Sequence, residues 1–317
     1  MAVEREHSAS EDRIQVSAGD GKAVLSSGEQ AYRIAARTAY ILKRWPVIPG
    51  IIIFMLLFGA AFAPLLEPFD PLKVDLKERN SPPSWFTDGS DKYFLGGDPV
   101  GRDILSRLIE STRITVAVVF FSITVGIVTG TALGLISGYV GGVIDEVIMR
   151  IVDVWAALPY LLIILTIVVV FGQSFTVLIG SLALLSWPGA VRLVRAEALT
   201  VREADYVMSA KVAGASGLRI MWKHIMPQTI HIVIVTATLS TGTLILTEAT
   251  LSFLGAGVPA PHPSWGAMTS EGREYLRDSW WVSVIPGTAI ILVVMAGNFM
   301  GDWLRDRLDP RLRQLMD

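Results

Sequence analysis

Residues 114–144 read ITVAVVFFSITVGIVTGTALGLISGYVGGVI and carry no charged side chain. A helix needs about 20 apolar residues to cross the hydrocarbon core of a bilayer, so this run predicts a membrane-spanning helix. We expect the helix to end near Ser137, ahead of a group of glycines. Gly126, Gly130 and Gly134 recur every four residues and leave a strip of one helix face without side chains. We expect this strip to pack inside the subunit's own bundle; a contact face for a second subunit is the alternative.

Other apolar runs place further spans before and after this one, at 45–66, 154–191, 225–253 and 279–301. The 154–191 run is too long for one helix, and Gly172-Gln173-Ser174 divides it into two spans, the first starting near Glu146. Prolines within three of the spans predict kinks, because each removes a backbone hydrogen bond: Pro159, Pro188 and Pro286. Charged residues make up 18% of the 317-residue chain, against about 25% in soluble domains. The sequence therefore predicts an all-α polytopic membrane protein with six transmembrane helices.

The distribution of Lys and Arg predicts the orientation of these spans. With an even number of spans both termini lie on one side, and 18 of the 27 basic residues then fall in segments on that side. Basic residues are enriched in cytoplasmic segments, so we expect both termini in the cytoplasm. Trp265, Trp280 and Trp281 are expected at the opposite membrane interface, where tryptophan is enriched.

The chain divides into three parts. Residues 1–30 are polar and aperiodic and are expected to form a disordered cytoplasmic tail. Residues 31–45 mix aromatic and basic side chains, as in an amphipathic lead-in helix on the membrane surface. The transmembrane domain takes up 46–317. It contains an outer loop at 67–113, a cytoplasmic loop at 192–228 and a second outer loop at 254–278.

The sequence lacks the motifs of an enzyme. No G-x-x-x-x-G-K-[S/T] phosphate-binding loop occurs, there is no cysteine, and the four histidines are scattered: His7, His224, His231 and His262. We therefore expect no catalytic residue, no metal site and no cofactor, and a conduit or scaffold whose energy comes from elsewhere. A net charge of −2 gives no indication of nucleic-acid binding.

The polar segment 192–228 is expected to form a helical hairpin between two spans. Residues 204–213 predict a short helix, Gly214 suits the position just after its end, and Ser216 can cap the next helix. Apolar residues then mark a second helix at helical spacing, with Pro227 expected to end it before the fifth span: Leu218, Met221, Trp222 and Ile225. From the pattern alone, an amphipathic loop on the membrane surface and a contact site for a soluble partner are both open.

Ser209-Ala210, then Gly214, then Pro227 resembles the EAA loop of ABC importer permeases, E-A-A-x3-G-x9-I-x-L-P. Met208, His224 and Met226 depart from that pattern, as in the peptide-transporter branch. Three more stretches, at 95–107, 145–159 and 301–310, resemble the C-type permease subunit of dipeptide, oligopeptide and nickel ABC importers, although Trp303 stands where the family usually has Gly. The resemblance covers about residues 35–313.

The resemblance implies the topology of a type I ABC importer permease in a bacterial inner membrane. The expected partners are a homologous second permease, two cytoplasmic ABC ATPases and an extracytoplasmic binding protein. The expected substrates are di- or oligopeptides; nickel, glutathione or sugars are the alternatives. By position in the EAA loop, the residues expected at the ATPase contact are Asp205, Tyr206, Ser209, Ala210, Lys211, Gly214 and Pro227.

Charges within the spans are also candidate site residues. Glu248 lies inside the fifth span, where a carboxylate is costly unless it is paired, protonated or in contact with water. It is a candidate for lining the translocation path; a hydrogen-bonded contact between helices is the alternative. Glu146, Arg150 and Asp153 share one helix face, and we expect them to form a network that holds helix ends together near the cytoplasmic side.

The rival hypothesis is a secondary transporter driven by an ion gradient, which predicts inverted repeats and paired charges within the membrane. No clear internal repeat is visible, and Glu248 has no obvious basic partner at its depth. A membrane scaffold is a third possibility.

Overall fold

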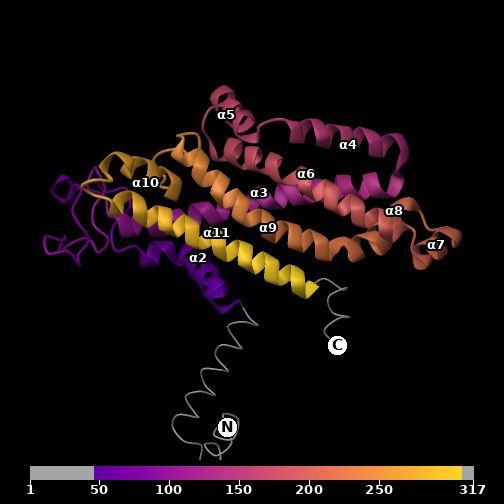
Figure 1. The fold of residues 1–317 in the computed structure, drawn as a ribbon, viewed down its shortest axis with the longest axis horizontal. Coiled ribbons are helices and arrows are strands. Elements are labelled where there is room, and N and C mark those ends of the chain that lie inside the picture. Colours follow the sequence, from indigo (N-terminus) through magenta and orange to yellow (C-terminus); the bar gives the residue numbers. More distant parts are fainter. Residues whose placement is uncertain (1–45, 309–317) are drawn as a thin grey trace, which may run out of the picture. The chain divides into compact units, whose positions relative to one another are not determined.

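The computed structural model describes residues 46–308, so the expected tail at 1–30 and lead-in helix at 31–45 lie outside it. Within 46–308 all regular elements are helical, apart from one bridge between Gly97 and Asp103. Five helices are long and apolar enough to span a membrane: α2 (Val47–Leu66), α3 (Ile104–Val140), α6 (Phe175–Arg202), a continuous helix over Gly217–Phe253, and α11 (Trp281–Leu308). A bent pair, α4 (Gly142–Ala157) and α5 (Tyr160–Phe171), supplies the sixth if it is counted as one span. The all-α expectation is confirmed (Figure 1).

The shorter elements lie at the two ends of the long helices. α10 (Trp265–Gly272) and the 3-10 turns η1 (Leu76–Glu78) and η3 (Arg273–Tyr275) belong to one end, and α7 (Asp205–Val212) belongs to the other (Figure 1). The Gly217–Phe253 helix has three parts: α8 (Gly217–Ile220), the π-helical turn η2 (Met221–Ile225) and α9 (Met226–Phe253).

α3 is longer than the sequence suggested at both ends. Its first turn is capped by Asp103, whose carboxylate accepts a hydrogen bond from the Ser106 N–H at 2.9 Å, so the last ten residues of the outer loop expected at 67–113 belong to this helix. The helix also continues past Ser137 to Val140. It ends there because Gly141 has φ of 69°, a conformation that a helix cannot continue.

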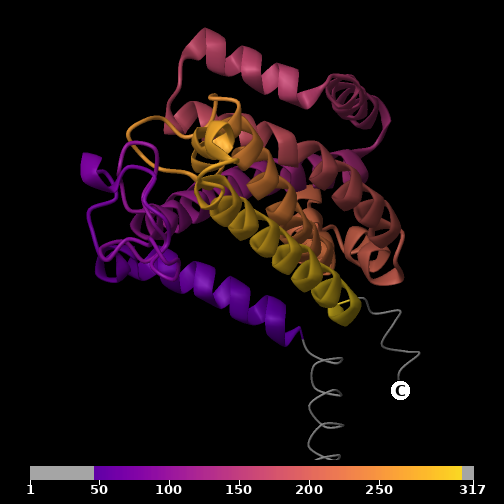
Figure 2. The same ribbon diagram turned by 60° about the vertical axis from the view of Figure 1, so that its left-hand side comes forward.

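The third span is broken. Leu158 is extended, as is usual before proline, and the chain turns by 87° between α4 and α5 at Pro159 (Figure 2). The expectation of one kinked helix is therefore wrong here. Pro188 and Pro286 differ, since they lie within continuous helices α6 and α11.

The glycine strip of α3 faces α6. A Cβ added to Gly130 would lie 2.6 Å from the Ala190 Cβ, and one added to Gly134 would lie 2.9 Å from the Val194 Cβ. A Cβ added to Gly126 would likewise overlap the Ser186 side chain. These distances are shorter than any van der Waals contact, so only glycine lets the two backbones approach this closely. The strip is thus occupied by the chain's own α6 and is not free for a second subunit.

Two apolar clusters hold the helices together. The larger contains residues of α3, α5, α6, α9, α10 and α11, including Trp265 and Trp281, which are 2% and 5% exposed. The expected interfacial belt is therefore wrong for these two tryptophans, which are core residues; Trp280 is the exposed one. The smaller cluster lies where α3 and α6 meet the hairpin.

Candidate functional site

The first helix of the EAA-like hairpin and the turn after it have the geometry that the sequence predicted. α7 ends at Val212, and Gly214 follows with φ of 79°. The Ala215 N–H donates to the Ala210 carbonyl at 3.0 Å, and the Gly214 N–H donates to the Lys211 carbonyl at 3.1 Å. This pair of bonds is a Schellman motif, which uses a left-handed glycine to satisfy the last carbonyls of a helix. The segment is shorter than expected at its start, because 192–202 still belongs to α6.

The expected contact residues lie on the free side of α7. Asp205, Tyr206, Ser209, Lys211 and Gly214 are exposed, and Ala210 is partly buried. Only Val207 of this helix points inward, with 2% exposure. α7 therefore presents one inward side chain to its own chain and leaves open a surface of polar and small residues together with three larger ones, Tyr206, Met208 and Val212.

The smaller apolar cluster fixes the hairpin to the spanning helices. Val207, Ile220 and Ile225 are each 2% exposed or less and pack with buried residues of α3 and α6: Leu135, Val194, Ala198 and Val201. Burial of a branched aliphatic side chain contributes about 1.5–3 kcal/mol. The hairpin is thus held as a firm extension of α3 and α6.

Pro227 does not end the helix ahead of the fifth span. It lies in the first turn of α9, and the preceding turn widens so that the Met226 N–H bonds to the Met221 carbonyl, five residues back. A proline ring clashes with the carbonyl four residues earlier, and the π-helical turn relieves this clash. The helix from Gly217 to Phe253 is therefore continuous and links the hairpin to the membrane interior.

The apolar face expected for the second helix of the hairpin also needs correction. Ile220 and Ile225 are the buried residues, whereas Leu218 and Trp222 are 65% and 63% exposed. Two large apolar side chains thus extend the open surface beyond α7.

Glu248 is enclosed by protein. Its side chain is 1% exposed, and it accepts a hydrogen bond from the Ser252 hydroxyl at 2.7 Å, one turn further along α9. The Ser252 Oγ in turn accepts from the Val258 N–H at 3.1 Å. Among residues 46–308 Glu248 has no ion-pair partner. This arrangement favours the structural role, in which Glu248 ties the end of α9 to the loop that follows.

The charges of α4 pair across helices and not along α4. Asp145 binds the Arg195 guanidinium with both oxygens, at 2.5 and 2.6 Å, and Asp153 binds Arg192 at 2.8 Å. Glu146 and Arg150 form no ion pair within the described part of the chain. The expected network of Glu146, Arg150 and Asp153 is therefore corrected: only Asp153 is paired, and its partner lies on α6.

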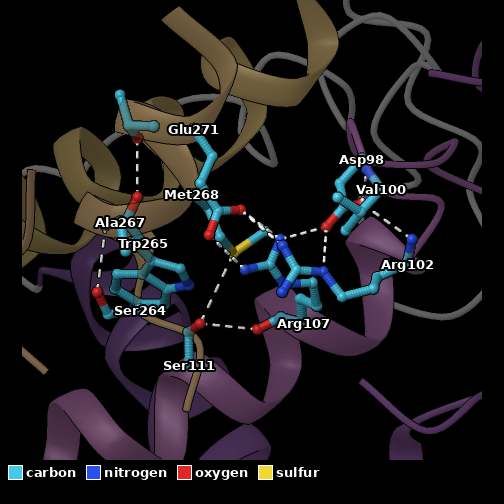
Figure 3. A network of polar contacts seen from close by, with 11 residues as sticks. Asp98, Val100, Arg102, Arg107, Ser111, Ser264, Trp265, Ala267, Met268 and Glu271 are labelled. Carbon is cyan, nitrogen blue, oxygen red and sulfur yellow. Dashed lines mark hydrogen bonds and ion pairs between the residues drawn. The ribbon is translucent and has the colours of Figure 1, made fainter. Parts of the chain in front are cut away.

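A second polar cluster, which sequence reasoning missed, lies at the α10 end (Figure 3). Arg107 is nearly buried and donates to Asp98 at 2.5 Å and to Glu271 at 2.7 Å, and Arg102 contacts the same two carboxylates at 2.6 and 3.0 Å. Asp98, Arg102 and Arg107 lie in the 95–107 motif, but nothing in the sequence indicated Glu271 as their partner. The cluster attaches α10 to the start of α3, supported by a bond from the Trp265 indole N–H to the Leu108 carbonyl at 3.1 Å.

Between residues 46 and 308 no three His, Asp or Glu side chains lie close enough together to hold a metal ion. The polar side chains described above pair with one another or lie on open surfaces.

Comparisons with known proteins agree with this architecture. The model of the family "binding-protein-dependent transport system inner membrane component" matches residues 130–314. The chain is 41% identical to the di/tripeptide transport permease DppC of Pseudomonas aeruginosa, over 83% of this chain and 88% of that protein. It is 42% identical to the dipeptide transport permease DppC of Haemophilus influenzae, over 86% and 92% of the two chains.

Two further likenesses are a third permease and a solved structure. The glutathione transport permease GsiD of Pectobacterium atrosepticum is 38% identical, over 86% of this chain and 89% of that protein. In fold, the chain resembles a structure of the MetNI methionine ABC transporter in an inward-facing conformation, with a TM-score of 0.51 and 20% identity over 64% of this chain and 96% of that chain. From the matched length and the identities to its relatives, this chain belongs to the family of binding-protein-dependent transport system inner membrane components.

Proposed function

We propose that this chain is the transmembrane permease subunit of an ATP-driven importer that carries di- or oligopeptides delivered by an extracytoplasmic binding protein. The observation that carries the proposal is the identity of about two fifths to dipeptide permeases over most of both chains. The glutathione permease among its relatives is also a transporter of a short peptide, so glutathione is the second candidate substrate.

The open surface of α7 supports docking of a cytoplasmic ATPase. Its polar and small residues are exposed together with Tyr206, Met208 and Val212, its buried side is fixed to α3 and α6, and the adjoining helix runs without a break into the apolar span. Movement of an ATPase bound at α7 would therefore displace α9 as a rigid rod. In this arrangement the chain itself hydrolyses nothing, and two ATPase subunits supply the energy to this chain and a homologous second permease.

The α7 end then faces the cytoplasm, with both chain termini on that side, and the α10 end faces the binding protein. This orientation rests on the excess of Lys and Arg in the segments assigned to the cytoplasm. The protein is placed in the bacterial inner membrane as a multi-pass subunit.

Purification in mild detergent followed by reconstitution tests the proposal. We expect two ATPase subunits and a second permease to co-purify, and proteoliposomes to take up labelled dipeptide only with ATP and the binding protein. Uptake by the single chain driven by an ion gradient would contradict the proposal and favour a secondary transporter.

A further inference from the structure

Helix α4 has three different faces. The inward face is narrow, with Val152 the only fully buried residue of the helix. One flank is apolar and exposed: Val147, Ile151 and Val154. The other flank is charged and exposed: Glu146, Arg150 and Asp153. A helix with one apolar and one charged flank separates an apolar medium from an aqueous one.

The charged flank lines a groove between α4 and α6. The groove has a volume of about 330 Å³, and its walls carry charges of both signs: Asp145, Glu146, Arg150, Asp153 and Arg195. Arg192 contributes a further charge through its contact with Asp153. Three carboxylates thus face three guanidinium groups, and the groove is neutral as a whole.

The groups of the groove differ in how firmly they are held. Asp145 is fixed by two bonds to Arg195 and also accepts a hydrogen bond from the Ser137 hydroxyl. Glu146 and Arg150 have no ionic partner in the described residues and are exposed. The groove therefore combines a rigid wall with one free carboxylate and one free guanidinium.

Contact of this flank with lipid tails is unfavourable, since unpaired charges are costly in hydrocarbon. A lipid phosphate group matches only one of the two free groups, because it can pair with Arg150 but is repelled by Glu146. A small molecule with one cationic and one anionic end complements the groove in sign and in net charge. A free peptide has this chemistry, with an ammonium group at one end and a carboxylate at the other.

We propose that the groove between α4 and α6 is a contact site for the charged ends of a peptide on its way through the membrane. The Arg150 guanidinium binds the peptide carboxylate, and the Glu146 carboxylate binds the ammonium group. The Asp145–Arg195 pair holds the groove open at a fixed width. The inference rests on the proposed function, because it takes the transported substrate as the ligand.

Thiol protection tests the site, since this chain has no cysteine and labelling of this subunit, separated from its partners after the reaction, then reports the introduced thiol alone. Met149→Cys places a thiol in the groove, and Ile151→Cys places one on the apolar flank as a control. The assembled complex in lipid nanodiscs is treated with a charged, membrane-impermeant methanethiosulfonate. We expect the thiol at 149 to react and the thiol at 151 to be protected by lipid.

Dialanine is then compared with N-acetyl-dialanine amide, which has the same backbone and no charged ends. We expect dialanine to slow the reaction at position 149 and the capped peptide to have no effect. Adding Arg150→Gln should raise the half-protecting concentration of dialanine about fivefold, as expected for loss of an exposed ion pair. Arg79→Gln, an exposed arginine of the loop after α2, is the matched control and should not change it.

Equal protection by both peptides, or protection by neither, overturns the inference. So does a reaction rate that follows the anionic-lipid content of the nanodisc and not dialanine, because the groove would then bind a lipid phosphate. ATP-dependent dipeptide uptake by the same complex distinguishes failure of the groove proposal from failure of the proposed function. If the complex takes up dipeptide but dialanine does not protect the thiol at position 149, only the groove as a peptide contact site is refuted. If the complex takes up no peptide, the proposed function is refuted.

Discussion

Gly214 offers the sharpest test of the hairpin as a docking element. Its φ of 79° is left-handed, and a Cβ added there meets no atom within 4 Å. A side chain at this position therefore causes no clash inside the chain and only the backbone cost of about 1–2 kcal/mol. If this cost lowers the population of the docking-competent hairpin, the apparent affinity for the ATPase falls by up to about 5- to 30-fold.

A bulky side chain should have a larger effect than backbone strain alone. We expect Gly214→Ala to weaken coupling within that range, and Gly214→Glu to abolish it, because the longer side chain holds the ATPase away from α7. ATP-dependent uptake and ATPase activity are measured together in proteoliposomes, normalised to the amount of assembled complex. Membrane insertion should be unchanged in both variants.

Gly255→Glu is the matched control. Gly255 has the same φ of 79° and the same open surroundings, but it follows α9 at the opposite end of the molecule. It should retain coupling. Wild-type uptake by Gly214→Glu would refute the docking assignment, and an equal loss in Gly255→Glu would show that backbone strain explains the effect.

Three other predictions concern stability, each measured by thermal unfolding of the purified complex. Gly130→Ala should destabilise the complex by about 1–3 kcal/mol through overpacking against α6, whereas Gly189→Ala, with no atom within 4 Å of the new Cβ, should not; equal stability of the two variants would contradict the packing argument. Arg107→Ala should cost about 1.5–3 kcal/mol, because Asp98 and Glu271 each lose a charged hydrogen bond but keep Arg102 as a partner, and a change below about 0.5 kcal/mol would contradict this reasoning. Burial and a hydrogen bond with Glu110 raise the pKa of Glu67, just after α2, to about 7. The stabilising contribution of protonated Glu67 is complete below its ordinary pKa of 4.5 and is lost as the pH rises through 7, so Glu67→Gln should raise thermal stability at pH 8 and leave it unchanged at pH 4.

The hairpin shows how far local sequence rules reach. The extent of α7, its glycine end and its open face all follow from helix propensity, capping and the EAA-like spacing. These rules do not predict that the helix continues through Pro227. A proline can end a helix or be accommodated by a wider turn, and the choice depends on whether the residues around it are held in place by packing. Here Ile220 and Ile225 are held against α3 and α6, and the helix continues.

The charged residues show where sequence reasoning stops. Helical spacing placed Glu146, Arg150 and Asp153 on one face of α4, which is a local property. It could not identify Arg192 and Arg195 as the partners of this helix, or Glu271 as the partner of Arg107. Ion pairs depend on distances in space between residues far apart in the chain.

The sequence by itself determined the helical class, the number of apolar segments, the absence of a phosphate-binding loop and the family resemblance. Each of these depends on composition or on residues close together in the chain. The tertiary structure decided that the glycines of α3 are covered by α6, that Glu248 is enclosed within its own subunit, and that α4 turns a charged flank toward a groove. These features depend on which helix faces which, and that is set by the packing of the whole bundle.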